Sequence, residues 1–348
     1  MYKFKRIYLP EFIEYLQKTY FVFAPVKSGT ETEFKQITSF TEIDQSRLNT
    51  TISPKEIFFP RSEVLFTYDE DGIKTPPKRE KPAALWGMRA CDTRSMRILN
   101  DVFANAHQMP EKDMFKDPYW IDKYKDCLLI TEACLNPLST CFCNWFSSGP
   151  FDETGSDIFV VKGEVDYYLK GITPKGKEVL AGFEKTEKTI AKDEEELKVL
   201  QSIADSYMNP PTDLGDLKDK LGKIWDDPLW DEIGAKCINC GACAYVCPTC
   251  HCFDVSDEGK GNKGKRVRLW DACMFQLFTK EASGHNPRSN SIHRVRQRIM
   301  HKYNYFVDNY QKFLCTGCGR CVTVCPVNMD IREIIKQILD HKIEKKDK

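Results

Sequence analysis

The sequence CINCGACAYVCP fills residues 237–248, and the sequence CTGCGRCVTVCP fills residues 315–326. Both read C-x2-C-x2-C-x3-C-P, the pattern with which bacterial ferredoxins hold a pair of [4Fe–4S] clusters. In such proteins three closely spaced thiolates surround one cluster, and the fourth cysteine ligates the other. The spacing therefore predicts that the two runs cross over and form a single ferredoxin-type core.

The crossed pattern assigns eight cysteines to two clusters. The predicted ligands of the first cluster are Cys237, Cys240, Cys243 and Cys325. The predicted ligands of the second cluster are Cys315, Cys318, Cys321 and Cys247. Structural zinc sites explain the pattern poorly, because zinc ribbons combine C-x2-C pairs with longer spacers. Gly241 and Gly319 lie between the second and third ligands of their runs, where we expect the missing Cβ to let the backbone approach the inorganic sulfides.

The composition limits the class of protein. The chain has 348 residues, a formal net charge of zero and sixteen cysteines. The length suggests two domains, and the balanced charge gives no general attraction to nucleic acid or membranes. We find no apolar run of transmembrane length and no signal peptide in the charged N-terminal residues. So many cysteines without an export signal indicate metal ligation in a reducing compartment, which we expect to be the cytoplasm of an anaerobe.

Residues 1–162 alternate between helical and strand patterns, which predicts an α/β domain, with α+β as the alternative. Helices are expected over residues 9–20 and 93–103. The predicted strands are 20–24, 57–59, 64–68, 83–88, 127–131 and 157–161.

A second group of cysteines accompanies these strands. Cys91 and Cys134 follow the strands at 83–88 and 127–131, at the sheet edge where ligands bind in open α/β folds. Together with Cys141 and Cys143 they are enough for a third [4Fe–4S] cluster. Cysteines also occur in cores as small hydrophobic residues, and spacing alone leaves both interpretations open. Cys127, inside a strand, is expected to be such a core residue.

Residues 163–235 are predicted to form a helical bridge between two domains. A turn-rich stretch at 171–182 is followed by a charged helix at 185–208 and a helix at 214–224. Residues 236–348 are then expected to be a mostly helical, ferredoxin-like domain. Its insert and C-terminal part are predicted to be helical at 268–282, 292–307 and 330–343.

Two features of this last domain stay open. Arg294, Arg298 and Lys302 recur at helical spacing and form one basic stripe. The stripe is either a solvated helix face or a source of positive charge for anionic clusters or an acidic partner. The sequence GKGNKG at 259–264 matches a dinucleotide-binding pattern, but no buried strand precedes it, and we expect a flexible loop.

Three further cysteines have no assigned role. They are Cys250, Cys252 and Cys273. Four interpretations fit them: residues that line a cluster pocket, redox-sensitive thiols, replacements for one of the assigned ligands, or ligands of a further metal together with His251. Spacing does not choose among these interpretations.

Several short motifs together resemble one known family. They are RACD at 89–92, CFC at 141–143, CPTCHC at 247–252, WDAC at 270–273, GHN at 284–286 and the second cysteine run. Over about residues 50–335 the chain resembles the iron–sulfur β subunit of cytoplasmic sulfhydrogenases and the related iron–sulfur subunit of anaerobic sulfite reductase. The resemblance implies a third cluster on Cys91, Cys134, Cys141 and Cys143, and it places Cys250, Cys252 and Cys273 in the family pattern without giving them a role.

The resemblance also implies an electron-transfer subunit of a multi-subunit oxidoreductase. Its partners would be a flavin subunit with FAD, NAD(P) and a [2Fe–2S] cluster, and a catalytic hydrogenase, sulfite reductase or heterodisulfide-reductase-type subunit. No catalytic acid or base is expected in this chain. Two alternatives are a self-contained reductase of sulfur compounds that uses a cluster or the spare thiols, and a structural or redox-sensing cluster protein.

Overall fold

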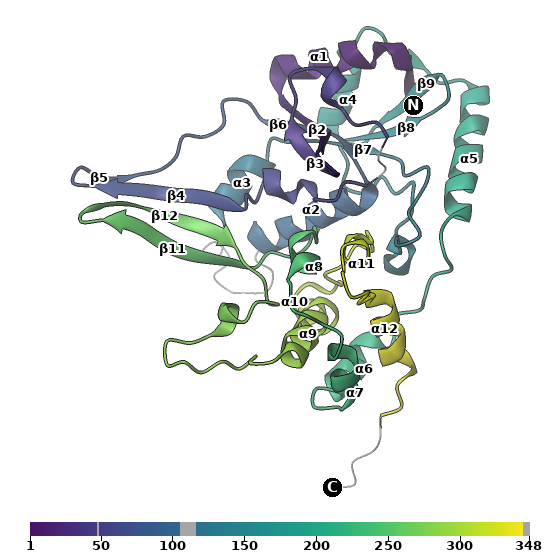
Figure 1. Cartoon of the computed structure of the whole chain (residues 1–348). Coiled ribbons are helices and arrows are strands. Elements are labelled where there is room, and N and C mark those ends of the chain that lie inside the picture. Colours follow the sequence, from purple (N-terminus) through teal and green to yellow (C-terminus); the bar gives the residue numbers. More distant parts are fainter. Residues whose placement is uncertain (47–48, 105–115, 344–348) are drawn as a thin grey trace.

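The computed structural model of the chain describes residues 1–46, 49–104 and 116–343. These residues form an upper body built on a mixed sheet, a lower body of helices, and a long β arm that projects between them (Figure 1).

The upper body is organised by its sheet, which has eight strands within the described residues, in the order β10-β1-β9-β8-β7-β6-β2-β3. The strand bounds are β1 Tyr2–Lys5, β2 Phe21–Ser28, β3 Glu31–Gln36, β6 Ala83–Met88, β7 Leu128–Glu132, β8 Ile158–Lys162, β9 Asp166–Gly171 and β10 Glu187–Lys188. Strands β2, β6, β7 and β8 are parallel, and antiparallel strands extend the sheet on both sides. Every residue of β6 is buried, which explains its unbroken apolar sequence.

Helices cover both faces of this sheet. On one face, α1 (Leu9–Thr19) and α4 (Pro174–Ala181) pack around Trp86 of β6. On the other face, α2 (Ala90–Phe103) and α3 (Pro118–Tyr124) pack around its neighbour Leu85. Successive strand residues point to opposite faces, so one strand serves both cores. The chain therefore has the mixed α/β content that its sequence predicts.

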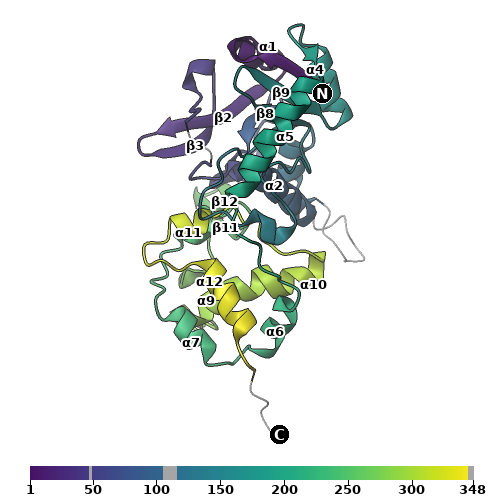
Figure 2. The same ribbon diagram turned by 90° about the vertical axis from the view of Figure 1, so that its right-hand side faces the viewer.

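The predicted boundary at residue 162 needs correction. Strands β9 and β10 come from the expected bridge, yet they belong to the main sheet. The stretch predicted to be turn-rich contains α4, which begins with Pro174 and is capped by the Thr173 side chain. Helix α5 (Ala191–Ser206) lies along the side of the upper body (Figures 1 and 2), and α6 (Leu217–Lys223) and α7 (Leu229–Gly234) join the lower body.

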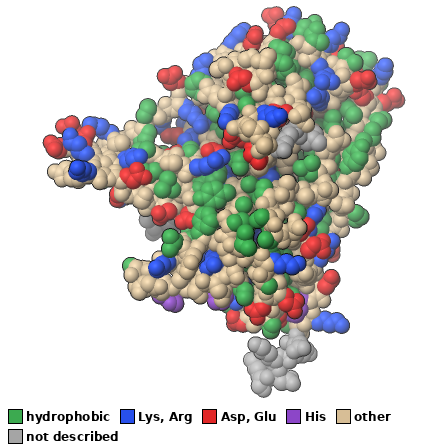
Figure 3. All heavy atoms as spheres, viewed as in Figure 1, with side chains coloured by type: hydrophobic (Ala, Val, Ile, Leu, Met, Phe, Trp, Pro, Cys, Tyr) green, Lys and Arg blue, Asp and Glu red, His purple; other side chains and the backbone are tan. Residues whose placement is uncertain are grey.

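The arm is a sheet made by two distant parts of the chain. In the described residues its strand order is β11-β12-β4-β5. The bounds are β4 Ser62–Asp69, β5 Gly72–Lys74, β11 Phe253–Lys260 and β12 Lys263–Trp270. Acidic and basic side chains are mixed over its tip (Figure 3).

Three local predictions fail at or near the arm. The helix expected over 268–282 is wrong, because β12 continues to Trp270 and a 3-10 turn, Leu277–Thr279, follows. The segment 259–264, expected to be a flexible loop, is mostly paired: only residues 261–262 connect β11 to β12, and the other four belong to the hairpin strands. The strand expected at 57–59 is wrong, because residue 57 ends a 3-10 turn, Pro54–Ile57, that begins with a proline, and a turn and a bend follow at 58 and 59.

The lower body is helical. Its helices are α8 Ala242–Tyr245, α9 Ser291–Met300, α10 Phe306–Tyr310, α11 Arg320–Thr323 and α12 Ile331–Asp340, with a π-helical segment, His301–Tyr305, between α9 and α10. Trp230, Ile299, Tyr303 and Ile335 are central to its core. None of the helices in the described part of the chain is long and apolar enough to span a lipid bilayer.

Candidate metal centres

The two cysteine runs adopt matching backbone conformations. Asn239 and Gly317 occupy equivalent positions with φ of 57° and 65°, and Gly241 and Gly319 follow with φ of 75° and 74°. A short helix begins directly after each of these glycines, α8 in the first run and α11 in the second. Left-handed backbone favours glycine or asparagine, so the sequence repeat encodes two copies of one loop.

The loops form two cavities with cysteine walls. The outer cavity has Cys237, Cys240, Cys243 and Cys325 in its wall, together with Cys321. The central cavity has Cys247, Cys315, Cys318 and Cys321 in its wall. Each run therefore places its fourth cysteine at the cavity of the other run, which is the crossed arrangement that the spacing predicts.

Buried positive charge accompanies these cavities. The side chains of Arg298 and Lys302 are 8% and 2% exposed, so the interpretation of the basic stripe as a solvated face does not hold. Arg298 is in the wall of both cavities, and its Nε and Nη2 atoms have no hydrogen-bond partner among the described residues. Lys302 Nζ lies 3.3 Å from Cys247 Sγ. Unpaired buried donors are costly, and anionic clusters in these cavities would satisfy them.

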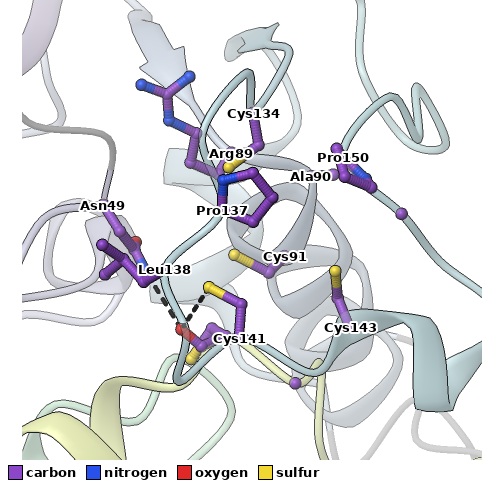
Figure 4. A pocket seen from close by; sticks show the side chains of 13 residues that line it. Asn49, Arg89, Ala90, Cys91, Cys134, Pro137, Leu138, Cys141, Cys143 and Pro150 are labelled. Carbon is purple, nitrogen blue, oxygen red and sulfur yellow. Dashed lines mark hydrogen bonds between the residues drawn. The ribbon is translucent and has the colours of Figure 1, made fainter. Parts of the chain in front are cut away.

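A third cavity lies between the main sheet and the lower body. Its wall contains all four cysteines of the second group, namely Cys91, Cys134, Cys141 and Cys143. Figure 4 shows these side chains around one hollow. We call it the N-terminal cavity.

The sheet topology explains how these four residues meet. Cys91 is in the first turn of α2, directly after β6, and Cys134 lies two residues after β7. Because β6 and β7 are parallel neighbours, their carboxyl ends bring both cysteines to one edge. Cys141 and Cys143 follow in the next loop, and Cys143 starts a 3-10 turn.

The N-terminal and central cavities are joined backbone to backbone. Phe142 N donates to Gly317 O at 2.8 Å. A Cβ on Gly317 would lie 2.4 Å from the Phe142 carbonyl, and one on Gly319 would lie 2.6 Å from Thr140 O. A Cβ on Gly241 would meet the Phe275 ring at 2.4 Å. Neighbouring protein atoms therefore leave no room for a Cβ at these glycines. The approach to sulfide that we expect at Gly241 and Gly319 stays a prediction.

Replacing Gly317 with alanine is expected to lower the free energy of unfolding by at least about 2 kcal/mol, through the clash with Phe142 and the left-handed backbone. Gly261→Ala is the matched control, because Gly261 has a similar φ of 61° but no heavy atom within 4 Å of the place that a Cβ would take. The control should lose about 1 kcal/mol. Equal losses in urea unfolding would show that the loop contact adds nothing.

Burial shapes the chemistry of these thiols. It raises the pKa of Cys141, Cys143 and Cys321 to about 12 and that of Cys318 to about 11. Such thiols stay protonated at neutral pH until a cation replaces the proton. Metal uptake at these sites must therefore release protons.

The cysteine arrangement does not suit a single metal ion. No group of three or more His, Cys, Asp or Glu side chains within the described residues converges closely enough to hold one. The cysteines instead stand in fours around three cavities. This geometry fits a larger inorganic group better than tetrahedral zinc, whose thiolates all lie about 2.3 Å from the metal.

The spare cysteines lie at the base of the arm, outside the walls of the three cavities. Cys252 precedes β11 and Cys273 follows β12. A hydrogen bond from the Cys273 thiol lowers the pKa of Cys252 to about 6. The thiol of Cys250 contacts Cys247. Cys127 is buried in the core between the sheet and α2, as predicted.

Two buried contacts near the cavities were not predicted from the sequence. Lys55 Nζ donates to Cys247 O and Cys250 O at 3.0 and 2.7 Å. Arg320 forms a bidentate ion pair with Asp92. Both join residues about 190 or more positions apart. The sequence shows Asp92 in the RACD motif and Arg320 between two predicted ligands, but nothing in it indicates that these two side chains are in contact.

Comparison with known proteins agrees with this geometry. Residues 236–329 match the family described as a 4Fe–4S dicluster domain. Over 333 residues the chain is 26% identical to sulfhydrogenase 2 subunit beta of Pyrococcus furiosus, covering 95% of this chain and 96% of that protein. No solved structure matches the chain significantly. The predicted similarity to a sulfhydrogenase β subunit is therefore confirmed, as is the presence of a 4Fe–4S dicluster domain.

Proposed function

We propose that this chain is an iron–sulfur electron-transfer subunit with three [4Fe–4S] clusters. The observation that carries the proposal is that each of three cavities has a complete set of four cysteines in its wall. The proposed ligands are Cys237, Cys240, Cys243 and Cys325 in the outer cavity, Cys315, Cys318, Cys321 and Cys247 in the central cavity, and Cys91, Cys134, Cys141 and Cys143 in the N-terminal cavity.

When bound, such clusters accept and release single electrons. The chain supplies the environment that sets their potentials. Backbone N–H groups of Asn239 and Met329 donate to Cys237 Sγ and Cys325 Sγ at 3.4 and 3.1 Å. Arg298 and Lys302 bring positive charge to the cavities, and the apolar core of the lower body excludes water. Each of these factors alters how easily a cluster is reduced.

The similarity to one component of a sulfhydrogenase supports the presence of partner subunits. We propose that the chain exchanges electrons with a flavin subunit that carries FAD, NAD(P) and a [2Fe–2S] cluster. At the other end it would serve a catalytic hydrogenase, sulfite reductase or heterodisulfide-reductase-type subunit. The chain itself then needs no acid or base.

The iron content tests the number of clusters. Anaerobically reconstituted protein is expected to bind about twelve iron atoms and as many acid-labile sulfides, four for each cluster. Cys143→Ala should lower the iron content to about eight, because the N-terminal cavity loses a ligand. Cys127→Ala is the control and should retain about twelve, since Cys127 lies in the core. An unaltered protein with about eight iron atoms would remove the third cluster from the proposal.

A further inference from the structure

The three cavities form a row. Cys318 lies in the wall of both the N-terminal and the central cavity. Cys321 and Arg298 lie in the walls of both the central and the outer cavity. Within the described residues, the N-terminal and outer cavities have no wall residue in common. The central cavity therefore stands between the other two.

The contact between the N-terminal and central cavities is short. Cys141 Sγ lies 3.9 Å from Cys318 O, which also accepts a hydrogen bond of 3.0 Å from Asn49 Nδ2. Phe142, between two proposed ligands of the N-terminal cavity, lies in the wall of the central cavity. The loop that serves one cavity thus forms part of the other.

A buried ion pair fixes this contact. Arg320, between Cys318 and Cys321, binds Asp92, which directly follows Cys91. The two side chains are 2% and 1% exposed, and Arg320 also donates to Thr50 O and Thr50 Oγ1 at 2.7 and 3.0 Å. Moving Cys91 away from Cys318 and Cys321 would therefore leave two buried charges without their partners.

The ends of the row are the parts nearest to solvent. In the outer cavity Cys240 is exposed, and its neighbour Ile238 is 61% exposed. Leu138 in the wall of the N-terminal cavity is 43% exposed. Cys247 and Cys318 of the central cavity are both buried. Electron tunnelling weakens exponentially with distance, so a partner can reach the end cavities far more readily than the central one.

From this geometry, and on the basis of the proposed function, we infer the order of the electron path: outer cluster, central cluster, N-terminal cluster, or the reverse. The central cluster is an obligatory intermediate. One redox partner then meets the chain beside Cys240, and the other meets it beside Leu138. The segment from Thr140 to Cys143, packed on Gly317 and Gly319, is one of the links between the upper and lower bodies.

Electron paramagnetic resonance of the full-length, reduced protein tests this order, because neighbouring reduced clusters split or broaden each other's signals. Cys240→Ala should remove the outer cluster and leave a coupled N-terminal and central pair. Cys143→Ala should remove the N-terminal cluster and leave a coupled central and outer pair. Iron analysis should find about eight atoms in each variant.

Two results would overturn the order while leaving the proposed function intact. In the first, the unaltered protein binds about twelve iron atoms, but the signal of the N-terminal cluster in Cys240→Ala shows no coupling to the central cluster. The other is rapid reduction of the central cluster by a flavin partner in a variant that lacks both end clusters. Failure of the proposed function itself would appear earlier, as missing iron in the unaltered protein.

Discussion

Replacing Asp92 with alanine is expected to lower the free energy of unfolding by about 3–5 kcal/mol, because it leaves the buried Arg320 guanidinium without its counter-charge. Arg320 Nη1 and Nη2 lie 2.6 and 3.2 Å from the two Asp92 oxygens. Asp92 also accepts from Arg89 N at the start of α2, so the variant loses a helix cap as well. Urea unfolding under anaerobic conditions measures the change.

Asp257→Ala is the control for this prediction. Asp257 accepts two hydrogen bonds from Arg266, at 2.9 and 2.7 Å, so its pair has the same chemistry and bidentate geometry. The pair lies on the arm, where both side chains are almost half exposed. Exposed pairs contribute little to stability. Similar losses in the two variants would contradict the structural role that we assign to Asp92 and Arg320.

The cysteine spacing was sufficient to predict the crossed arrangement of the lower body. The spacing acts over a short stretch of chain. Three ligands within seven residues define one loop, and the fourth cysteine of the run requires a second loop nearby. The parallel strands β6 and β7 carried similar information, because a cysteine after each apolar run had to reach the same sheet edge. In both places a short pattern determined a geometry without help from distant residues.

The sequence failed where distant segments determine the structure. Residues 268–270 were predicted to be helical, but β12 pairs with β4, about 200 residues earlier in the chain. Residues 163–188 were predicted to be part of a bridge, but β9 and β10 both pair with β1. Because β1 lies at the start of the chain, the local sequence does not reveal this pairing. The contact of Gly317 with Phe142 was hidden for the same reason. The sequence indicates that a position needs glycine, but it does not show which neighbouring atom excludes a Cβ there.

The basic stripe shows how much burial can change an interpretation. Helical spacing alone fitted both a solvated face and a charge source for clusters. Lys302 lies in the π-helical segment, a type of irregularity often found at functional sites. Its Nζ also lies 3.2 Å from Thr249 Oγ1 and 3.0 Å from Leu314 O. Burial opposes its charge, but the sulfur atoms of Cys247 and Cys250 outweigh burial and hold the pKa of Lys302 above its ordinary value.

Lys302→Met is therefore expected to shift the reduction potential of the central cluster to more negative values, by on the order of 100 mV. Reduction adds negative charge to the cluster, and the variant removes the nearby cation that stabilises it. A redox titration followed by electron paramagnetic resonance measures the shift. The N-terminal cluster should change less, because Lys302 is not in the wall of its cavity.

Arg296→Met is the matched control for Lys302→Met, since it removes one positive charge from α9. Arg296 Nη1 donates to Trp225 O at 2.7 Å, and the guanidinium stacks over the Trp225 ring, away from the cavities. Its removal should leave the central potential nearly unchanged. If Lys302→Met also left the potential unchanged while iron content stayed at about twelve, the buried cation would serve folding alone. The effect of Lys302 on folding stability can be separated from its effect on the reduction potential. Unfolding exposes the lysine to water, whereas reduction changes the charge of the cluster beside the lysine.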